Sequence, residues 1–343
     1  MNLLSLASPD IQRILDKALS GIKPTRDELR MLLELDPRSS AADLLRMTGR
    51  RIALQRFGHR AMLLCQTGVE TFPCPADCTF CSFGQSVNHA CPWRIAPEKL
   101  SEINAQLCAM PGTYAHFLLF MHTFDFAYLL STVEQSRKEL PEGISIVLNC
   151  GDLDAVQIAE LKAAGASGAY HVVRLGEGID TKLTVEQRVR TIELLKEAGM
   201  DWYTCCEPIG PEHSNEELLD RILLSADLEC FQNAVMRRVA VPGTPLASRG
   251  QITLLRSAQI VAVVLIAMQE NKVLSSLAIH EPDLLGLTSG ANCIYAEFGA
   301  NPRDLEAATE KGRGHSPEWC RAMLKDCGYT ALMQSASCED IPF

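Results

Sequence analysis

The chain has 343 residues, of which 47% are hydrophobic, and its formal net charge is −10. This composition supports a large buried core and excludes a disordered chain, which would have few apolar residues or one dominant charge. No run of lysine or arginine marks a nucleic-acid surface, so we expect no nucleic-acid partner.

The N-terminal segment carries charges early and lacks the basic start and apolar stretch of a secretory signal. The longest apolar run, residues 260–268, predicts a buried helix, because a bilayer-spanning helix needs about 20 apolar residues. We therefore expect a cytoplasmic protein without a membrane partner. Fourteen cysteines in a reducing compartment point to metal binding or thiol chemistry rather than to disulfides.

Residues 1–57 are predicted to form helices, because apolar residues recur at helical spacing over 27–34 and 41–57. From residue 58 onward, short apolar strands alternate with helices about eight times. The predicted strands are 61–65, 116–121, 145–149, 169–173, 202–205, 234–239, 273–277 and 293–296. The predicted helices between them are 97–108, 127–139, 154–164, 185–198, 216–226 and 254–269.

Three helical stretches end in glycine before a strand-like run, at Gly165, Gly199 and Gly290, where a left-handed C-terminal cap is expected. The repeated alternation predicts an α/β fold, a (β/α)8 TIM-type barrel. A doubly wound open sheet would give a similar pattern and stays an alternative. We expect an N-terminal helical extension over 1–57 and the barrel, with a C-terminal helix and tail, over 58–343. Site residues of such a barrel lie at the carboxyl ends of its strands.

The segment FPCPADCTFCSFG, which follows the first predicted strand, carries Cys74, Cys78 and Cys81, with Phe80 before the last cysteine. Three thiolates on one loop can hold three irons of a cubane cluster and leave the fourth iron open to a small molecule. A structural zinc site needs a closed set of four ligands, and the chain has no second Cys-x2-Cys pair. A [4Fe-4S] cluster is therefore the favoured interpretation.

CPADCTFC resembles the CxxxCxΦC loop of radical S-adenosylmethionine (SAM) enzymes. Most of the chain is similar to biotin synthase and its relatives, which include a hydrogenase maturase and the enzyme that makes methylornithine. The resemblance implies a complete barrel and a [4Fe-4S] cluster whose open iron is chelated by SAM. It also implies that an electron from flavodoxin or ferredoxin cleaves SAM to methionine and a 5′-deoxyadenosyl radical.

The same resemblance assigns SAM contacts to four further residues. Phe80 would lie against the adenine, and Glu177 and Arg188 occupy the positions of an acidic residue and an arginine that hold SAM. The stretch EPIG, with Ile209, is similar to the segment after the fifth strand that meets the adenine. It departs from the family pattern at Glu207, where a small or apolar residue is usual.

Biotin synthase holds a second, sulfur-donating cluster on three barrel cysteines and an arginine. Cys150 matches one of these cysteines, and Cys205 or Cys206 falls close to another, but the third cysteine and the arginine have no equivalent. Cys65, on the first strand, is expected to point inward in their place. Sulfur insertion at such an auxiliary cluster gives a lipoyl-type thiol or thioether and is one hypothesis. Radical fragmentation or rearrangement of a small amino or carboxylic acid is the second, and a non-catalytic iron–sulfur carrier is the third.

Polar residues close to predicted strand ends are candidates for contacts with a small-molecule or carrier-bound substrate. They are His122, Asp125, His171, Glu207, His280 and Glu297. Each of them would equally serve as a hydrogen-bonded core group.

Overall fold

Eight parallel strands close into a barrel in the computed structural model, which describes residues 6–88, 91–297, 315–335 and 339–343. These strands are β1 (Arg60–Gly68), β4 (Thr113–Leu119), β5 (Ser145–Asn149), β6 (Gly168–Tyr170), β7 (Asp201–Tyr203), β9 (Gln232–Arg237), β10 (Ser276–His280) and β11 (Cys293–Glu297). Each strand pairs with the next along the chain, and β11 returns to β1 with Met62 opposite Cys293 and Gln66 opposite Glu297. This closure confirms the predicted (β/α)8 barrel and excludes the open sheet.

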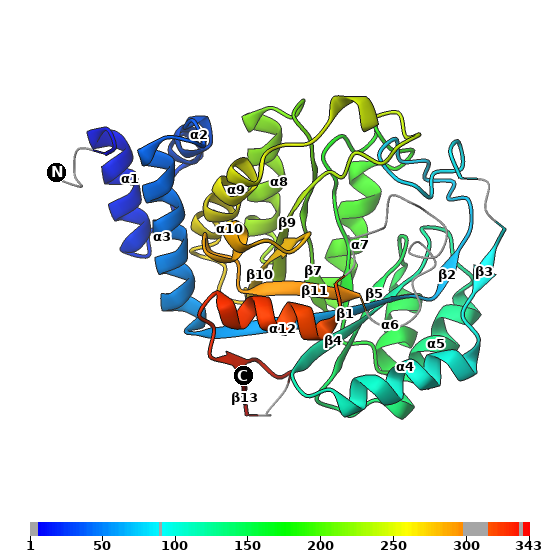
Figure 1. The fold of residues 1–343 in the computed structure, drawn as a ribbon. Coiled ribbons are helices and arrows are strands. Elements are labelled where there is room, and N and C mark those ends of the chain that lie inside the picture. Colours follow the sequence, from blue (N-terminus) through cyan, green and yellow to red (C-terminus); the bar gives the residue numbers. More distant parts are fainter. Residues whose placement is uncertain (1–5, 89–90, 298–314, 336–338) are drawn as a thin grey trace.

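Helices connect successive strands and form the outer layer (Figure 1). They are α4 (Pro97–Ala109), α5 (Phe126–Glu139), α6 (Ala155–Ala163), α7 (Val185–Glu197), α8 (Asn215–Asp227), α9 (Leu254–Ala267), α10 (Leu284–Leu287) and α12 (Pro317–Asp326). Capping boxes at Thr184 and Ser214 begin α7 and α8. Gly165 and Gly199 follow α6 and α7 with φ of +106° and +64°, which a residue with a side chain rarely adopts.

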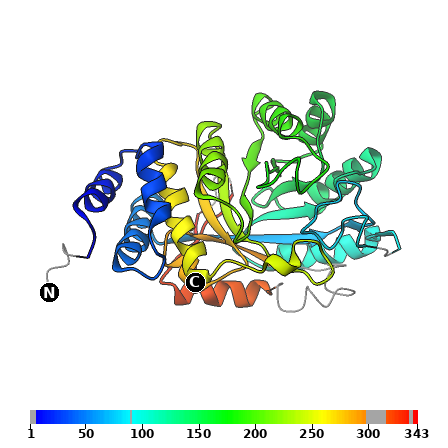
Figure 2. The ribbon, with the colours of Figure 1, turned by 90° about the horizontal axis from the view of Figure 1, so that it is seen from above.

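Three N-terminal helices, α1 (Pro9–Leu19), α2 (Arg26–Glu34) and α3 (Ser40–Phe57), lie beside α8 and α9 on one flank of the barrel (Figures 1 and 2). α3 packs along α9, and the buried side chains of all three helices belong to the same apolar cluster as the helix-facing side of the barrel. The division of the chain at residue 57 stays a prediction.

The barrel interior is filled by side chains that alternate with helix-facing ones along each strand. On β1, Met62 and Leu64 face the interior, while Leu63 and Cys65 face the helices. Phe117 lies at the centre of an aromatic cluster, with ring centroids 5.2 Å from Tyr203 and 5.2 Å from Tyr295 in edge-to-face orientation. This packed layer forms the floor beneath the carboxyl ends of the strands.

The apolar run predicted as a buried helix forms α9, which is buried at every residue from Ser257 to Ala267. Among the helices that the structure describes, none has the length and apolar character needed to cross a bilayer.

Short elements complete the fold. They are β2 (Glu70–Thr71), β3 (Trp93–Arg94), β8 (Cys206–Ile209), the 3-10 helix η2 (Ala247–Arg249), β12 (Ala331–Leu332) and β13 (Ile341–Pro342). β8 continues the fifth barrel strand after a break and pairs with β9. β12 joins the amino end of β1, where Arg60 lies opposite Ala331. β2 and β3 form an antiparallel pair that encloses the cysteine loop at the opposite end.

Candidate active site

The three cysteines of the predicted cluster motif lie on one loop between β2 and β3, beyond the carboxyl end of β1. Backbone hydrogen bonds fold this loop tightly. The Cys74 amide donates to the carbonyl of Phe83 at 2.7 Å, and the Cys81 amide donates to the carbonyl of Cys78 at 3.0 Å. The spacing of the motif therefore produces compact turns that bring the three thiols to one wall.

A second loop, which follows β6, supports the cysteine loop from outside. The Thr79 amide donates to the Asp180 carbonyl at 2.9 Å, and the Lys182 amide donates to the Ala76 carbonyl at 2.9 Å. The Lys182 ammonium also pairs with the Asp77 carboxylate at 2.8 Å. These contacts fix the cysteine loop relative to the barrel strands.

A cavity of about 230 Å³, named here the cluster-side cavity, lies against the cysteine loop. Its polar and sulfur-bearing lining residues include Cys74, Cys78, Cys81, His122, Cys150, Arg174 and Arg188. Burial raises the pKa of the Cys78 thiol to about 12, although the charge of Arg174 acts in the opposite direction. Such a thiol stays protonated until a metal ion displaces the proton.

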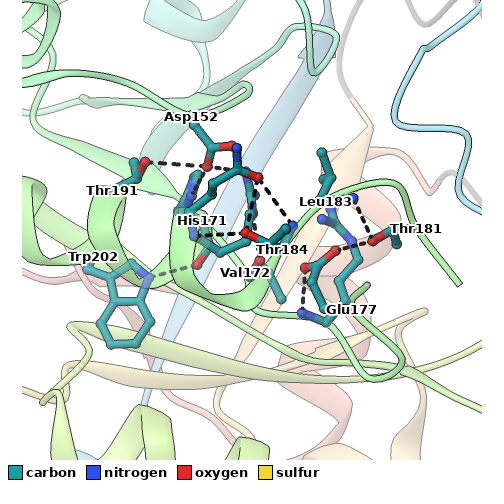
Figure 3. Close-up of polar contacts among 12 residues, drawn as sticks. Asp152, His171, Val172, Glu177, Thr181, Leu183, Thr184, Thr191 and Trp202 are labelled. Carbon is teal, nitrogen blue, oxygen red and sulfur yellow. Dashed lines mark hydrogen bonds and ion pairs between the residues drawn. The ribbon is translucent and has the colours of Figure 1, made fainter. Parts of the chain in front are cut away.

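Arg188, in the first turn of α7, reaches this cavity through a fixed guanidinium group. It is 2% exposed, its Nε donates to the Val172 carbonyl at 3.1 Å, and its Nη1 donates to Asp152 Oδ1 at 2.8 Å. The same carboxylate oxygen accepts from His171 Nε2 at 3.1 Å and from the Thr191 hydroxyl at 3.3 Å (Figure 3). Burial alone would raise the pKa of Asp152, but the hydrogen bond from His171 and the charge of Arg188 lower it below its usual value.

Arg174 was not among the sequence-predicted site residues, yet it lines two cavities. It lies in the run YHVVR beyond the end of β6 at Tyr170, and its Nε pairs with Glu207 Oε1 at 3.2 Å. Burial would lower the pKa of Arg174, but the negative charge of Glu207 raises it, so the group remains a cation. An arginine directly after the apolar run 169–173, which was predicted as a strand, is the signal that sequence reasoning could have used.

The second cavity, named here the barrel cavity, has a volume of about 190 Å³ and lies above the aromatic floor. Its lining includes Gln66, Phe80, Phe117, Asn149, Tyr170, Arg174, Glu207, Arg238, His280 and Tyr295. The Tyr170 hydroxyl donates to Glu207 Oε2 at 2.8 Å, so both oxygens of this carboxylate are oriented from the protein side. Burial, together with the nearby Cys205 and Glu207, raises the pKa of Tyr170 well above its usual value, so the phenol keeps its proton.

Sequence comparisons relate the chain to biotin synthases, although no model of a protein family matches it. The biotin synthase of a Sulfurihydrogenibium species is 24% identical over 272 residues, which cover 74% of this chain and 77% of the relative. That of Desulfatibacillum aliphaticivorans is 24% identical over 341 residues, which cover 95% of this chain and 99% of the relative. The chain is a biotin synthase-like member of the radical SAM superfamily.

Solved structures give the same fold for this radical SAM enzyme. Methylornithine synthase (PylB) has a TM-score of 0.74 at 19% identity, over 92% of this chain and 95% of that one. The hydrogenase maturase HydG from Carboxydothermus hydrogenoformans has a TM-score of 0.76 at 17% identity, over 95% of this chain and 80% of that one. As a radical SAM enzyme, the protein uses a [4Fe-4S] cluster and SAM, and the alternative of a non-catalytic carrier is set aside.

The cysteine loop fits a cubane cluster better than a single metal ion. Within residues 6–88, 91–297, 315–335 and 339–343, no three His, Cys, Asp or Glu side chains converge as ligands of one ion, which a zinc site would require. A cubane instead takes each thiolate on a different iron. The thiols of Cys74, Cys78 and Cys81 face one cavity from one loop, as that arrangement requires.

The four cysteines predicted for an auxiliary cluster do not share one face. Cys65 packs on the helix-facing side of β1, where its sulfur lies 3.7 Å from the Thr113 hydroxyl, so the expectation that it points inward is wrong. Cys206 belongs to the same outer cluster. Cys205 lies in the barrel interior, whereas Cys150 lines the cluster-side cavity. The strand alternation that separates the two faces explains the difference, because adjacent residues of one strand point to opposite sides.

Three other predicted residues are not among the lining residues of the two cavities. Asp125 caps α5, accepting from the amides of Ala127 and Tyr128 at 3.1 and 3.3 Å, and pairs with Arg94. His171 is 2% exposed and is bound to Asp152 rather than turned to a cavity. The Ile209 side chain packs in the outer apolar cluster. In this structure these side chains have contacts within the protein, and their direct contact with substrate or cofactor stays a prediction.

The remaining predicted residues lie at or near the cavities. Phe80, Glu207 and His280 line the barrel cavity, and the His280 ring centroid is 4.9 Å from that of Tyr295. His122 lines the cluster-side cavity, where burial and the charge of Arg188 lower its pKa. Glu297 Oε1 accepts from Gln66 Nε2 at 2.5 Å, next to the barrel cavity that Gln66 lines.

Glu177 organises the loop that supports the cysteine loop. Its carboxylate accepts from the Arg174 amide at 3.0 Å and from the Thr181 hydroxyl at 2.6 Å (Figure 3). Glu177 is 9% exposed and lies close to Arg174, Cys78 and Arg188. Its predicted contact with SAM stays a prediction, and the contacts within its loop are an additional role.

Proposed function

We propose that this radical SAM enzyme fragments or rearranges a small polar substrate held in the barrel cavity, without an auxiliary cluster. The observation that carries the proposal is the shared wall between the two cavities. Residues that line both are Cys81, Phe83, Leu119, Asn149 and Arg174. The two cavities therefore adjoin. A radical formed from SAM beside the cysteine loop would lie close to a substrate in the barrel cavity.

Different residues would bind the cluster and the separate parts of SAM. Cys74, Cys78 and Cys81 would hold the [4Fe-4S] cluster, which, when bound, supplies the electron that cleaves SAM to methionine and a 5′-deoxyadenosyl radical. Arg188 would pair with the carboxylate of SAM, because a buried cation beside a cavity favours an anionic partner. Phe80, on the wall of the barrel cavity, would stack against the adenine.

The size and polarity of the barrel cavity support a small polar substrate. Its volume of about 190 Å³ has room for several water molecules or for a small molecule in their place. Hydrogen-bond donors and acceptors surround it, on the side chains of Gln66, Glu207, Arg238 and His280. A small amino or carboxylic acid would satisfy such a lining, and the aromatic floor would keep water from the radical.

Sulfur insertion is the second candidate. It is favoured by the similarity to proteins named biotin synthase, and by Cys150 and Cys205, which lie at the cluster-side cavity and in the barrel interior. The outward positions of Cys65 and Cys206 weigh against it, because two cysteines on separate walls give a poor ligand set for a cluster.

Iron content and SAM cleavage test the proposal. We expect about four irons per chain in the anaerobically reconstituted enzyme. Cys78→Ala should lose the cluster and all formation of 5′-deoxyadenosine, whereas Cys91→Ala, at an exposed cysteine between β2 and β3, should keep both. Full SAM cleavage by Cys78→Ala would contradict the cluster assignment. Iron retained by a Cys74/Cys78/Cys81→Ala triple variant would indicate an auxiliary cluster and favour sulfur insertion.

The proposal includes a redox partner and a compartment. A reduced ferredoxin or flavodoxin would deliver the electron, as expected from the radical SAM resemblance. The cytoplasm is the proposed location, because a cluster with one open iron and many free thiols needs reducing surroundings. The volume of the barrel cavity favours a free small molecule over a carrier-bound substrate.

A further inference from the structure

Asp152 brings together three elements that are far apart in the sequence. It follows β5, in the loop LNCGDLD, and binds Arg188 and Thr191 of α7 together with His171 beyond β6. All three donors converge on the single oxygen Oδ1, at distances of 2.8, 3.3 and 3.1 Å. Figure 3 shows Asp152 with His171 and Thr191. A carboxylate oxygen with three donors is held in one orientation, and it in turn holds its donors.

The consequence for Arg188 is a fixed guanidinium group at the wall of the cluster-side cavity. Two of its nitrogens are used by the protein, Nε by the Val172 carbonyl and Nη1 by Asp152. In the described part of the chain, Nη2 has no hydrogen-bond partner, while the residue lines the cavity beside the cysteine loop. An arginine anchored on one side therefore presents its remaining donors to whatever the cavity binds.

The charges of Asp152 and Arg188 also favour a fixed position for Arg188. Arg188 is 2% exposed, and a buried cation without a counter-charge would be costly, so Asp152 makes its burial tolerable. His171 takes part as a neutral donor, because burial and the charge of Arg188 lower its pKa to about 3. The group formed by Asp152, His171 and Arg188 therefore keeps one negative and one positive charge over the working pH range.

We propose that Asp152 is a positioning residue for SAM, acting through Arg188 and touching neither SAM nor substrate. This inference rests on the proposed function, which assigns the SAM carboxylate to Arg188. Loss of the Asp152 charge should free Arg188 to rotate and weaken its hold on that carboxylate. Among the described residues, the side-chain hydrogen bonds of Asp152 go to α7 and His171 and not to the cysteine loop, so the cluster itself should be unaffected.

Calorimetric titration of SAM into the cluster-loaded enzyme tests the proposal. We expect Asp152→Asn to raise the Kd for SAM about tenfold, the loss of one charge-assisted hydrogen bond. Iron content should stay within error of the unsubstituted enzyme, and the KM for SAM should rise more than kcat falls. The melting temperature should fall, because a buried guanidinium loses its counter-charge, so SAM binding is measured at a temperature where the variant is fully folded. Asp154→Asn is the matched control. It lies in the same loop, but its side chain caps α6, a task that asparagine performs equally well.

A double-mutant cycle separates positioning through Arg188 from an independent effect. We expect the Asp152→Asn/Arg188→Ala double variant to bind SAM no more weakly than Arg188→Ala alone. Full additivity, or a Kd for Asp152→Asn within twofold of the unsubstituted value, would overturn the proposal. If Arg188→Ala itself binds SAM normally, the assignment of Arg188 in the proposed function fails, and the role of Asp152 fails with it.

A milder variant keeps the test valid if Asp152→Asn does not fold. Thr191→Val removes only the hydroxyl that bonds the same oxygen, without changing charge. We expect it to raise the Kd for SAM about threefold, because Asp152 keeps its charge and loses only the longest of its three hydrogen bonds. An unchanged Kd in this variant would contradict the claim that the contacts of Asp152 set the position of Arg188.

Discussion

The Glu207–Arg174 pair joins a buried carboxylate to a partly buried guanidinium in the lining of the barrel cavity. The Glu207 side chain is 8% exposed and the Arg174 side chain 21%, so removal of one partner leaves a charge with little water to solvate it. We expect Glu207→Leu to lower the free energy of unfolding by about 3 kcal/mol, measured by chemical denaturation. Glu216→Leu, which breaks an exposed pair with Arg26, should cost less than about 1 kcal/mol. Equal losses in the two variants would contradict the importance of burial.

For single residues, a motif within one loop could be predicted from the sequence, whereas the direction of a strand side chain could not. The thiols of Cys74, Cys78 and Cys81 were predictable because their spacing lies within one loop and needs no knowledge of the rest of the chain. The direction of the Cys65 side chain was not, since it depends on which of two alternating faces of β1 turns inward. His171 likewise follows a strand, but the loop in which it lies turns its ring to Asp152.

The contact between α3 and α9 depends on a glycine. A Cβ atom at Gly49 would lie 2.3 Å from the Ser289 carbonyl oxygen and 2.8 Å from the Ala262 Cβ. Alanine would gain about 1 kcal/mol of helix propensity, but a backbone oxygen at that distance cannot move without shifting the turn that carries it. We expect Gly49→Ala to lower the free energy of unfolding by about 1–3 kcal/mol in denaturant titrations. Arg51→Ala, at an exposed position of the same helix, is the control and should change it by less than about 0.5 kcal/mol.

Element positions were predictable where apolar runs and end signals coincide. The strand predicted at 145–149 matches β5, and the helix predicted at 185–198 matches α7 within one residue, because a capping box and Gly199 mark its ends. The strand predicted at 273–277 lies three residues early relative to β10. There the turn that leads into the strand carries apolar Val273 and Leu274, and only pairing with β9 selects Ser276 as the first strand residue.

For the whole molecule, barrel closure could be predicted only as a fold class. Eight alternations gave the (β/α)8 architecture, but the pairing of β1 with β11 joins residues more than 200 positions apart. The same long-range pairing brings Arg174, Glu207 and Arg238 to one cavity from three different strand ends. Such a meeting has no local sequence signal, which is why the barrel cavity was predicted only as a group of polar candidates.

The pH dependence of stability provides a test of burial at the amino end of the barrel. Burial raises the pKa of Asp201, the first residue of β7, to about 6, whereas an unfolded aspartic acid titrates near 3.8. Between these values the folded state binds more protons than the unfolded state, so stability falls as pH rises and is constant above about 7. Asp201→Asn removes this loss. We therefore expect the melting temperature of the variant, relative to the unsubstituted chain, to rise from pH 4.5 to pH 7 and then stay level.

Cluster-free protein is the appropriate sample for this measurement, because acid loss of the cluster would add its own pH dependence. Asp326→Asn, at the exposed end of α12, is the control and should shift the melting temperature by the same amount from pH 5 to pH 8. The melting-temperature difference between Asp201→Asn and the unsubstituted chain could also stay constant over this range. That result would mean that water reaches the Asp201 carboxylate in the folded barrel. A rising difference would show that the amino end of the barrel excludes water around β7.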